Sequence, residues 1–242
     1  MQTALIVFAG ALAGGFVSGL AGFGTGLVGL GFWLHVLSPA TASTLVVVCS
    51  VLSQLQTIPV IWHTIDRARI WPMLLAGLLG VPLGTHLLSR VDPSVFRLCI
   101  GVFLLAFSLF MLLGRVRTRL VWGGRTADAV IGFLGGIMGG LAGLSGPLPT
   151  VWATLRGWSK HERRSVFQTF NLTILLAALV SHAASGLLTA ELGIAALIAL
   201  PATVIGSWLG VRAYGRLSDH VFHNTVLCLL FASGMILVWG SL

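Results

Sequence analysis

The chain has few charged residues, and acidic residues are the scarcest among them. Only 6 of its 242 residues are Asp or Glu, 14 are Lys or Arg, and charged residues make up 8% of the total. A soluble domain carries about 25% charged residues, so this composition excludes an ordinary soluble protein. Because 57% of the residues are hydrophobic and the mean hydropathy is +1.01, we predict a membrane protein with almost no soluble mass.

Cysteine is also rare, and its spacing excludes the common metal and redox motifs. Cys49, Cys99 and Cys228 all lie inside apolar runs, without CxxC or CxxH spacing, and are typical of small buried hydrophobic residues. The sequence also lacks HExxH, a phosphate-binding loop and paired carboxylates. We therefore predict no enzyme activity, no metal site, no catalytic residues and no cofactor.

No positively charged region precedes the first apolar run, so no signal peptide is expected. The net charge of +8 does not indicate nucleic-acid binding, because the basic residues lie in short loops between apolar segments. In such loops positive charge reports orientation in the membrane. The expected surroundings are a lipid bilayer, and we retain a homodimer as a candidate oligomer.

Apolar stretches long enough to cross about 30 Å of hydrocarbon recur along the chain. Each half contains four of them. The predicted segments are 3–37, 42–62, 70–89 and 94–113 in the first half, and 127–155, 165–182, 190–211 and 219–240 in the second. We divide the chain into an N-terminal transmembrane repeat (1–113), a basic cytoplasmic linker (114–126) and a C-terminal transmembrane repeat (127–242).

The two halves repeat one pattern at an offset of 121 residues. A glycine-rich stretch interrupts the first segment of each half, at 14–26 and again at 135–147. Ser50 falls on Asn171 in the same register, and the glycines of 80–84 match those of 206–210 after five extra residues. Interrupted segments in corresponding positions of two halves indicate the binding site of a secondary transporter.

The first segment of each half has an unusual length. A straight helix over 3–37 would be roughly 52 Å long, which exceeds one crossing, yet 35 residues are few for two crossings and a turn. A re-entrant pair of half-length helices that meet at the glycines fits better. Tight helix packing through Gly15-x-x-x-Gly19 and Gly136-x-x-x-Gly140 is the alternative explanation of the glycines.

The distribution of basic residues supports the re-entrant arrangement. If each first segment returns to its starting side, the halves are inverted and 12 of the 14 basic residues face the cytoplasm, leaving only Arg90 and Arg97 outside. If each first segment crosses once, the count is 6 inside and 8 outside. The positive-inside rule favours the first arrangement. We therefore predict an all-α polytopic membrane protein made of two inverted repeats, each a re-entrant helix pair plus three transmembrane helices, with both termini periplasmic.

A re-entrant pair places a helix N-terminus inside the membrane, where free N–H groups and the helix dipole suit an anion. We expect Ser145 to cap the second such helix, with Pro147 in its first turn and Thr25 as the hydroxyl of the other. Polar residues of the next segments form the expected wall of the site. The predicted substrate-binding residues are Gly24, Thr25, Gly26, Ser145, Gly146, Pro147, Ser50, Gln54, Gln168 and Asn171.

Several polar residues of this set are also compatible with purely architectural roles. Ser145 and Thr25 could simply cap buried helix ends, and uncharged polar residues often hydrogen-bond between membrane helices. His35, His86 and His182 lie near segment ends or interfaces and are more typical of hydrogen-bonded bystanders than of proton carriers. No acidic residue lies in the middle of a segment, so a proton relay or cation site is not expected.

The glycine motif at 15–26, its repeat ending in Gly143-Leu144-Ser145-Gly146-Pro147, and the glycine pairs at 80–84 and 206–210 resemble the TauE/SafE family over essentially the whole chain. These proteins are also called sulfite exporters or toluene-sulfonate uptake permeases. The chain departs from the family's triple glycine at Gly24-Thr25-Gly26. The resemblance implies movement of sulfite, thiosulfate or small organosulfur anions across a bacterial inner membrane. Because no mid-membrane carboxylate could carry a coupling cation, we expect export driven by the membrane potential. A proton- or sodium-coupled uptake permease and a non-transporting assembly subunit are the alternatives.

Overall fold

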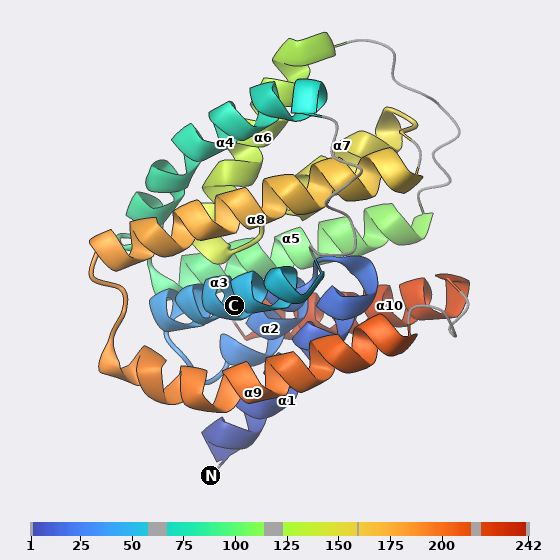
Figure 1. Ribbon diagram of the computed structural model, residues 1–242. Coiled ribbons are helices and arrows are strands. Elements are labelled where there is room, and N and C mark those ends of the chain that lie inside the picture. The colour runs from blue at the N-terminus through green and yellow to red at the C-terminus, as the bar shows by residue number, and fades with distance from the viewer. Residues whose placement is uncertain (1, 58–66, 114–122, 159, 214–218, 241–242) are drawn as a thin grey trace.

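The computed structural model describes residues 2–57, 67–113, 123–158, 160–213 and 219–240, and these residues form ten helices without strands (Figure 1). The helices are α1 (Gln2–Ala21), α2 (Thr25–Trp33), α3 (Pro39–Thr57), α4 (Arg67–Leu88), α5 (Pro93–Leu113), α6 (Gly124–Ala142), α7 (Pro147–Leu155), α8 (Lys160–Ala184), α9 (Ala190–Ala213) and α10 (Asp219–Trp239). Six helices of the described residues are long and apolar enough to cross a membrane: α1, α3, α4, α5, α8 and α9. The predicted all-α polytopic membrane fold is confirmed.

The helices begin and end within five residues of the predicted segments wherever the structure describes the boundary. Most of the predicted basic linker, 114–122, lies outside the described residues, and its last three residues, 124–126, already belong to α6. The agreement follows from the bilayer, because an apolar segment of about 20 residues has only the helix available to satisfy its backbone.

Both interrupted segments fold as antiparallel helix pairs. The Trp33 indole at the end of α2 donates to the carbonyl of Val7 near the start of α1 at 3.2 Å. In the second half, the Trp152 indole of α7 donates to Asp128 near the start of α6 at 2.7 Å. Each short helix therefore runs back along the long helix that precedes it. We call these pairs the first hairpin (α1–α2) and the second hairpin (α6–α7).

The expectation of half-length arms is wrong. The arms have 20 and 9 residues in the first hairpin, and 19 and 9 in the second. At 1.5 Å per residue, α1 is about 30 Å long and α2 about 14 Å. The break comes late because most glycines of each stretch remain helical, and the chain turns only at Gly22–Gly24 and at Gly143–Gly146.

The helical glycines serve close packing between the two halves. A Cβ at Gly15 or Gly19 of α1 would collide with the backbone of Thr203 or Ser207 of α9. The equivalent glycines of α6 lie equally close to α4, with Gly136 against the backbone of Gly77. Small residues allow membrane helices to approach until their backbones touch. Both explanations of the glycines hold, each for different residues: some pack helices and others turn the chain.

The helix pairs joined by these glycines lie on opposite sides of the bundle, α4 with α6 and α1 with α9 (Figure 1). Helices α3 and α8 lie between them in this view. They run antiparallel, since Thr44 of α3 contacts His182 late in α8, whereas Gln54 and the early α8 residue Gln168 both contact Gly22. Each close-packed pair takes one helix from each half of the chain.

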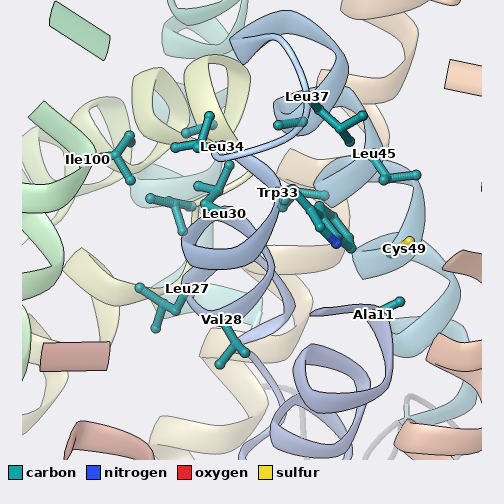
Figure 2. Packing of buried hydrophobic residues seen from close by; sticks show 14 of the residues in the cluster. Ala11, Leu27, Val28, Leu30, Trp33, Leu34, Leu37, Leu45, Cys49 and Ile100 are labelled. Atoms are coloured by element: carbon teal, nitrogen blue, oxygen red, sulfur yellow. The ribbon is translucent and has the colours of Figure 1, made fainter. Parts of the chain in front are cut away.

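The short helix α2 is held by burial. A nine-residue helix is unstable alone, but all residues of α2 except Phe32 are buried. Its side chains Leu27, Leu30 and Trp33 pack in a core cluster with Leu45 and Cys49 of α3 (Figure 2). Packing therefore fixes the position of the α2 N-terminus inside the bundle.

Candidate functional site

The breaks of the two hairpins border one small cavity. Its volume is about 10 Å³, which is room for about one water molecule. The residues that line it come from both hairpins, α3 and α8. They are Ser18, Phe23, Gly24, Gly26, Leu27, Ser50, Gln54, Gly143, Leu144, Gly146, Pro147, Asn171 and Leu175. Seven of the ten predicted site residues are in this set.

Repeat-related residues from both halves of the chain line the cavity. Four pairs of lining residues are separated by 121 positions, the offset found in the sequence. The pairs are Phe23 with Leu144, Gly26 with Pro147, Ser50 with Asn171, and Gln54 with Leu175. The cavity therefore lies where corresponding elements of the two halves meet, which is where transporters with internal repeats bind their substrates.

The cavity lies at mid-height of the central helices. Asn171 is eleven residues after the first residue of α8 and thirteen before its last. Ser50 is eleven residues after the first residue of α3 and seven before its last described residue. In a helix that crosses a bilayer, these positions are close to the midplane.

The first break contains two glycines with positive φ, and a glutamine side chain binds its backbone. Gly22 and Gly24 have φ values of 80° and 127°, in the region that favours glycine. The Gly22 N–H donates to the Ser18 carbonyl at 2.8 Å, and the Gly22 carbonyl accepts from Nε2 of Gln54 at 2.6 Å. Backbone groups inside a membrane protein need such partners. The first turn of α2, at Thr25, Gly26 and Leu27, follows directly.

The second break ends α6 at a left-handed glycine. Gly143 has φ 67°, and its N–H donates to the Gly139 carbonyl at 2.9 Å, which is the αL ending of a helix. The N-cap of α7 is Gly146. Pro147 occupies the first turn, which the sequence predicted. The cavity thus receives the start of α7 as well as that of α2.

The expected capping by Ser145 is wrong. Helix α7 has no side-chain cap, and Ser145 Oγ instead donates to Oδ1 of Asn171 in α8. Ser145 precedes the N-cap residue Gly146, and Pro147 and Pro149 leave only the Leu148 N–H in the first turn as a capping target. Ser145 positions Asn171, which lines the cavity, without lining it itself.

Thr25 and Gln168 are also outside the lining set. The Thr25 hydroxyl faces the Gly14 carbonyl of α1 at 3.5 Å, because the return of α2 turns this first-turn side chain toward α1. Gln168 is fully buried against Gly22, and neither its Nε2 nor its Oε1 has a hydrogen-bond partner in the part of the chain that the structure describes.

Six lining residues are absent from the sequence-based set: Ser18, Phe23, Leu27, Gly143, Leu144 and Leu175. Leu175 follows Gln54 by 121 residues, so the repeat offset could have identified it. Phe23 lies between the two glycines of the first break and contacts Phe167 edge-on, with ring centroids 4.9 Å apart. Ser18 carried no signal beyond its place in the glycine stretch.

None of the lining residues is charged. The acidic side chains that the structure describes, Asp92, Asp128 and Glu191, all lie elsewhere, and Asp128 is buried with Trp152. The described residues also contain no cluster of His, Cys, Asp or Glu that could hold a metal ion. The fixed partial charges at the cavity are therefore those of the helix ends, the positive N-termini of α2 and α7 and the negative C-termini of α1 and α6.

His182 lies in the last turn of α8 and is hydrogen-bonded, as the sequence indicated. It is fully buried between three helices, with Nδ1 3.0 Å from the Thr44 hydroxyl and Nε2 2.7 Å from the Gly140 carbonyl. The carbonyl can only accept, so Nε2 carries a proton and donates. This contact network joins α3, α6 and α8, and His182 is not a lining residue.

Comparison with known proteins gives one match. No curated protein and no solved structure matches the chain. The model of a family described as "Sulfite exporter TauE/SafE" matches residues 6–237, which include both hairpins and every residue of the cavity wall. The chain therefore belongs to the TauE/SafE family of sulfite exporters, membrane transporters of sulfur-containing anions.

Proposed function

We propose that this protein is a secondary transporter that exports sulfite, thiosulfate or a small organosulfonate across the bacterial inner membrane, driven by the membrane potential. The observation that carries the proposal is the cavity between the two hairpin breaks. It combines two helix N-termini, the polar side chains of Ser50, Gln54 and Asn171, and no charged lining residue. Such a site suits an anion, because the free N–H groups and positive ends of two helices meet there.

We further propose that the two halves, 1–113 and 127–242, are inverted repeats joined by a cytoplasmic linker, with both termini in the periplasm. The antiparallel course of the equivalent helices α3 and α8 supports this. The hairpins support it as well, because a segment that turns back adds no net crossing to its half. With this topology most of the basic residues face the cytoplasm.

The proposed direction follows from electrostatics. A potential of 100 mV, negative inside, favours the exit of one negative charge by about 2.3 kcal/mol, or roughly fifty-fold in concentration. An exporter of anions therefore needs no coupling ion, whereas an importer must use a cation gradient. No acidic side chain among the lining residues could carry such a cation.

The cavity must widen during transport. A volume of about 10 Å³ holds one water, and an oxoanion with four or more heavy atoms needs several times that space. Movement of one hairpin break relative to the other would supply it, because the cavity wall takes residues from both. Access from each side in turn is the general mechanism of transporters with internal repeats.

The test is flux of labelled sulfite in proteoliposomes under an imposed membrane potential. Flux should follow the potential and continue without a proton gradient. The variant Gly146→Leu should insert normally but lose transport, since a side chain there meets Phe167 at 2.8 Å and Phe23 at 3.4 Å. The matched control is Gly193→Leu on α9, where an added side chain has open space.

Two results would contradict the proposal. Flux that ignores voltage and requires a proton gradient would establish coupled transport, and His35 and His182 would then be the first residues to replace. Wild-type flux in correctly inserted Gly146→Leu protein would mean that the anion passes elsewhere.

A further inference from the structure

The two helix N-termini at the cavity differ in the hydrogen-bond donors that they can offer. The first turn of a helix has N–H groups without partners inside the helix. In α2 these belong to Thr25, Gly26 and Leu27. In α7, Pro147 and Pro149 have no N–H, and only Leu148 remains. The first turns therefore have four backbone donors, three in α2 and one in α7, and two of these, Gly26 and Leu27, belong to residues that line the cavity.

Side chains add few donors to this set. Asn171 accepts from Ser145 through Oδ1, so its Nδ2 is the group that it can offer to the cavity. Gln54 uses Nε2 to bind the Gly22 carbonyl at 2.6 Å. The hydroxyls of Ser18 and Ser50 complete the polar wall. All of these groups are neutral.

Gln168 gives an independent indication that a polar ligand completes this region. Its amide is fully buried against Gly22, at the first break, and both of its polar atoms lack a hydrogen-bond partner among the described residues. A buried polar group without a partner is unfavourable. A ligand that reaches the Gly22 side of the widened cavity would relieve this cost.

We propose that the cavity accepts a singly charged oxoanion and excludes doubly charged ones. This inference rests on the proposed function and specifies its substrate class. Each helix N-terminus is equivalent to roughly half a positive charge, so α2 and α7 together balance at most about one negative charge, and the C-termini of α1 and α6 at the same breaks reduce this value. No lining cation is present to balance a second.

A second charge is also expensive to desolvate. The Born energy grows with the square of the charge, so a dianion loses roughly four times the hydration energy of a monoanion on leaving water. The few neutral donors of this site cannot replace that hydration. Bisulfite and organosulfonates carry one charge, whereas thiosulfate carries two at neutral pH. The inference therefore removes thiosulfate from the candidate substrates.

The experiment uses the full chain in proteoliposomes with labelled sulfite, methanesulfonate and thiosulfate in turn. From one pH unit below the second ionisation of sulfite to one unit above it, the bisulfite fraction falls about tenfold, and sulfite flux should fall with it. Methanesulfonate, singly charged throughout, controls for pH effects on the protein. A tenfold sulfite gradient should be balanced by about 59 mV, the value for one charge, instead of about 30 mV for two. Thiosulfate flux should equal that of protein-free vesicles.

The outcomes separate this inference from the proposed function. If sulfite flux falls as the pH rises and thiosulfate flux is absent, the result supports both the charge selectivity and the proposed function. Thiosulfate flux comparable to sulfite flux, or balance near 30 mV, overturns the charge selectivity and leaves anion transport standing. Thiosulfate flux with balance near 59 mV would mean that a dianion moves with a proton, which also overturns the selectivity. No flux of any of the three anions overturns the proposed function itself.

Discussion

The indole Nε1 of Trp152 donates to Oδ1 of Asp128 across the second hairpin at 2.7 Å, and both side chains are buried. The first hairpin has a counterpart, because Trp33 donates to the carbonyl of Val7, and Val7 precedes Asp128 by 121 residues. Each short helix thus donates a hydrogen bond to the repeat-related position of its long helix. The acceptor is a backbone carbonyl in the first hairpin and a carboxylate in the second.

The Asp128 hydrogen bond can be tested by substitution. Asp128→Val, which places the residue type of Val7 there, leaves the buried Trp152 N–H without its acceptor and should lower the free energy of unfolding by about 1–3 kcal/mol. Asp128→Asn keeps a carbonyl acceptor and should cost less. Thermal unfolding in detergent measures both, and a double-mutant cycle with Trp152→Phe isolates the pair. Additive effects in that cycle would contradict the importance of the bond.

The glycine contacts between α4 and α6 predict a position-specific effect on stability. Gly136→Ala should lower the unfolding temperature, at a cost of about 1–3 kcal/mol, because the new methyl group collides with the backbone of Gly77. Gly193→Ala is the matched control in α9, where a methyl group meets open space and alanine is the better helix former. Equal effects of the two substitutions would show that close packing at Gly136 is not needed.

The charge of the cavity predicts opposite tolerance for two replacements of Asn171. Asn171→Asp adds a negative charge beside the anion and should reduce sulfite flux at least about tenfold, which corresponds to 1.36 kcal/mol of lost binding. Asn171→Ser introduces the residue found at the repeat-related position, Ser50, and should retain more flux. Initial rates in proteoliposomes with matched protein insertion provide the comparison. Faster transport by the aspartate variant would place the anion away from α8.

The predicted topology can be tested with single cysteines. The exposed residues Thr126 and Ser185 flank the second hairpin and α8. If the hairpin returns to its starting side, cysteine at Thr126 should react with an impermeant reagent only from the cytoplasm, and cysteine at Ser185 only from outside. Cys99 and Cys228 are exposed and must first be replaced, whereas Cys49 is buried. Labelling of both positions from one side would exclude the inverted arrangement.

Several properties of the protein follow from the sequence without tertiary information. Hydropathy located the membrane segments because the bilayer leaves an apolar stretch no alternative to the helix. The 121-residue register and the polar faces of the next segments identified the two breaks and seven residues of the cavity wall, because repeat-related elements meet at one place. The signal in both cases is periodic and local, so the one-dimensional sequence contains it.

Tertiary contacts determined the roles of individual residues. Gly15 and Gly22 belong to one glycine stretch, yet the first packs against α9 and the second turns the chain, because only the neighbouring helix determines which glycine needs its missing side chain. Ser145 bonds Asn171 instead of capping α7, and the partners of His182 are Thr44 of α3 and Gly140 of α6. These outcomes depend on partners 26 to 138 residues away in the chain, and a local sequence pattern contains no information about contacts at that separation.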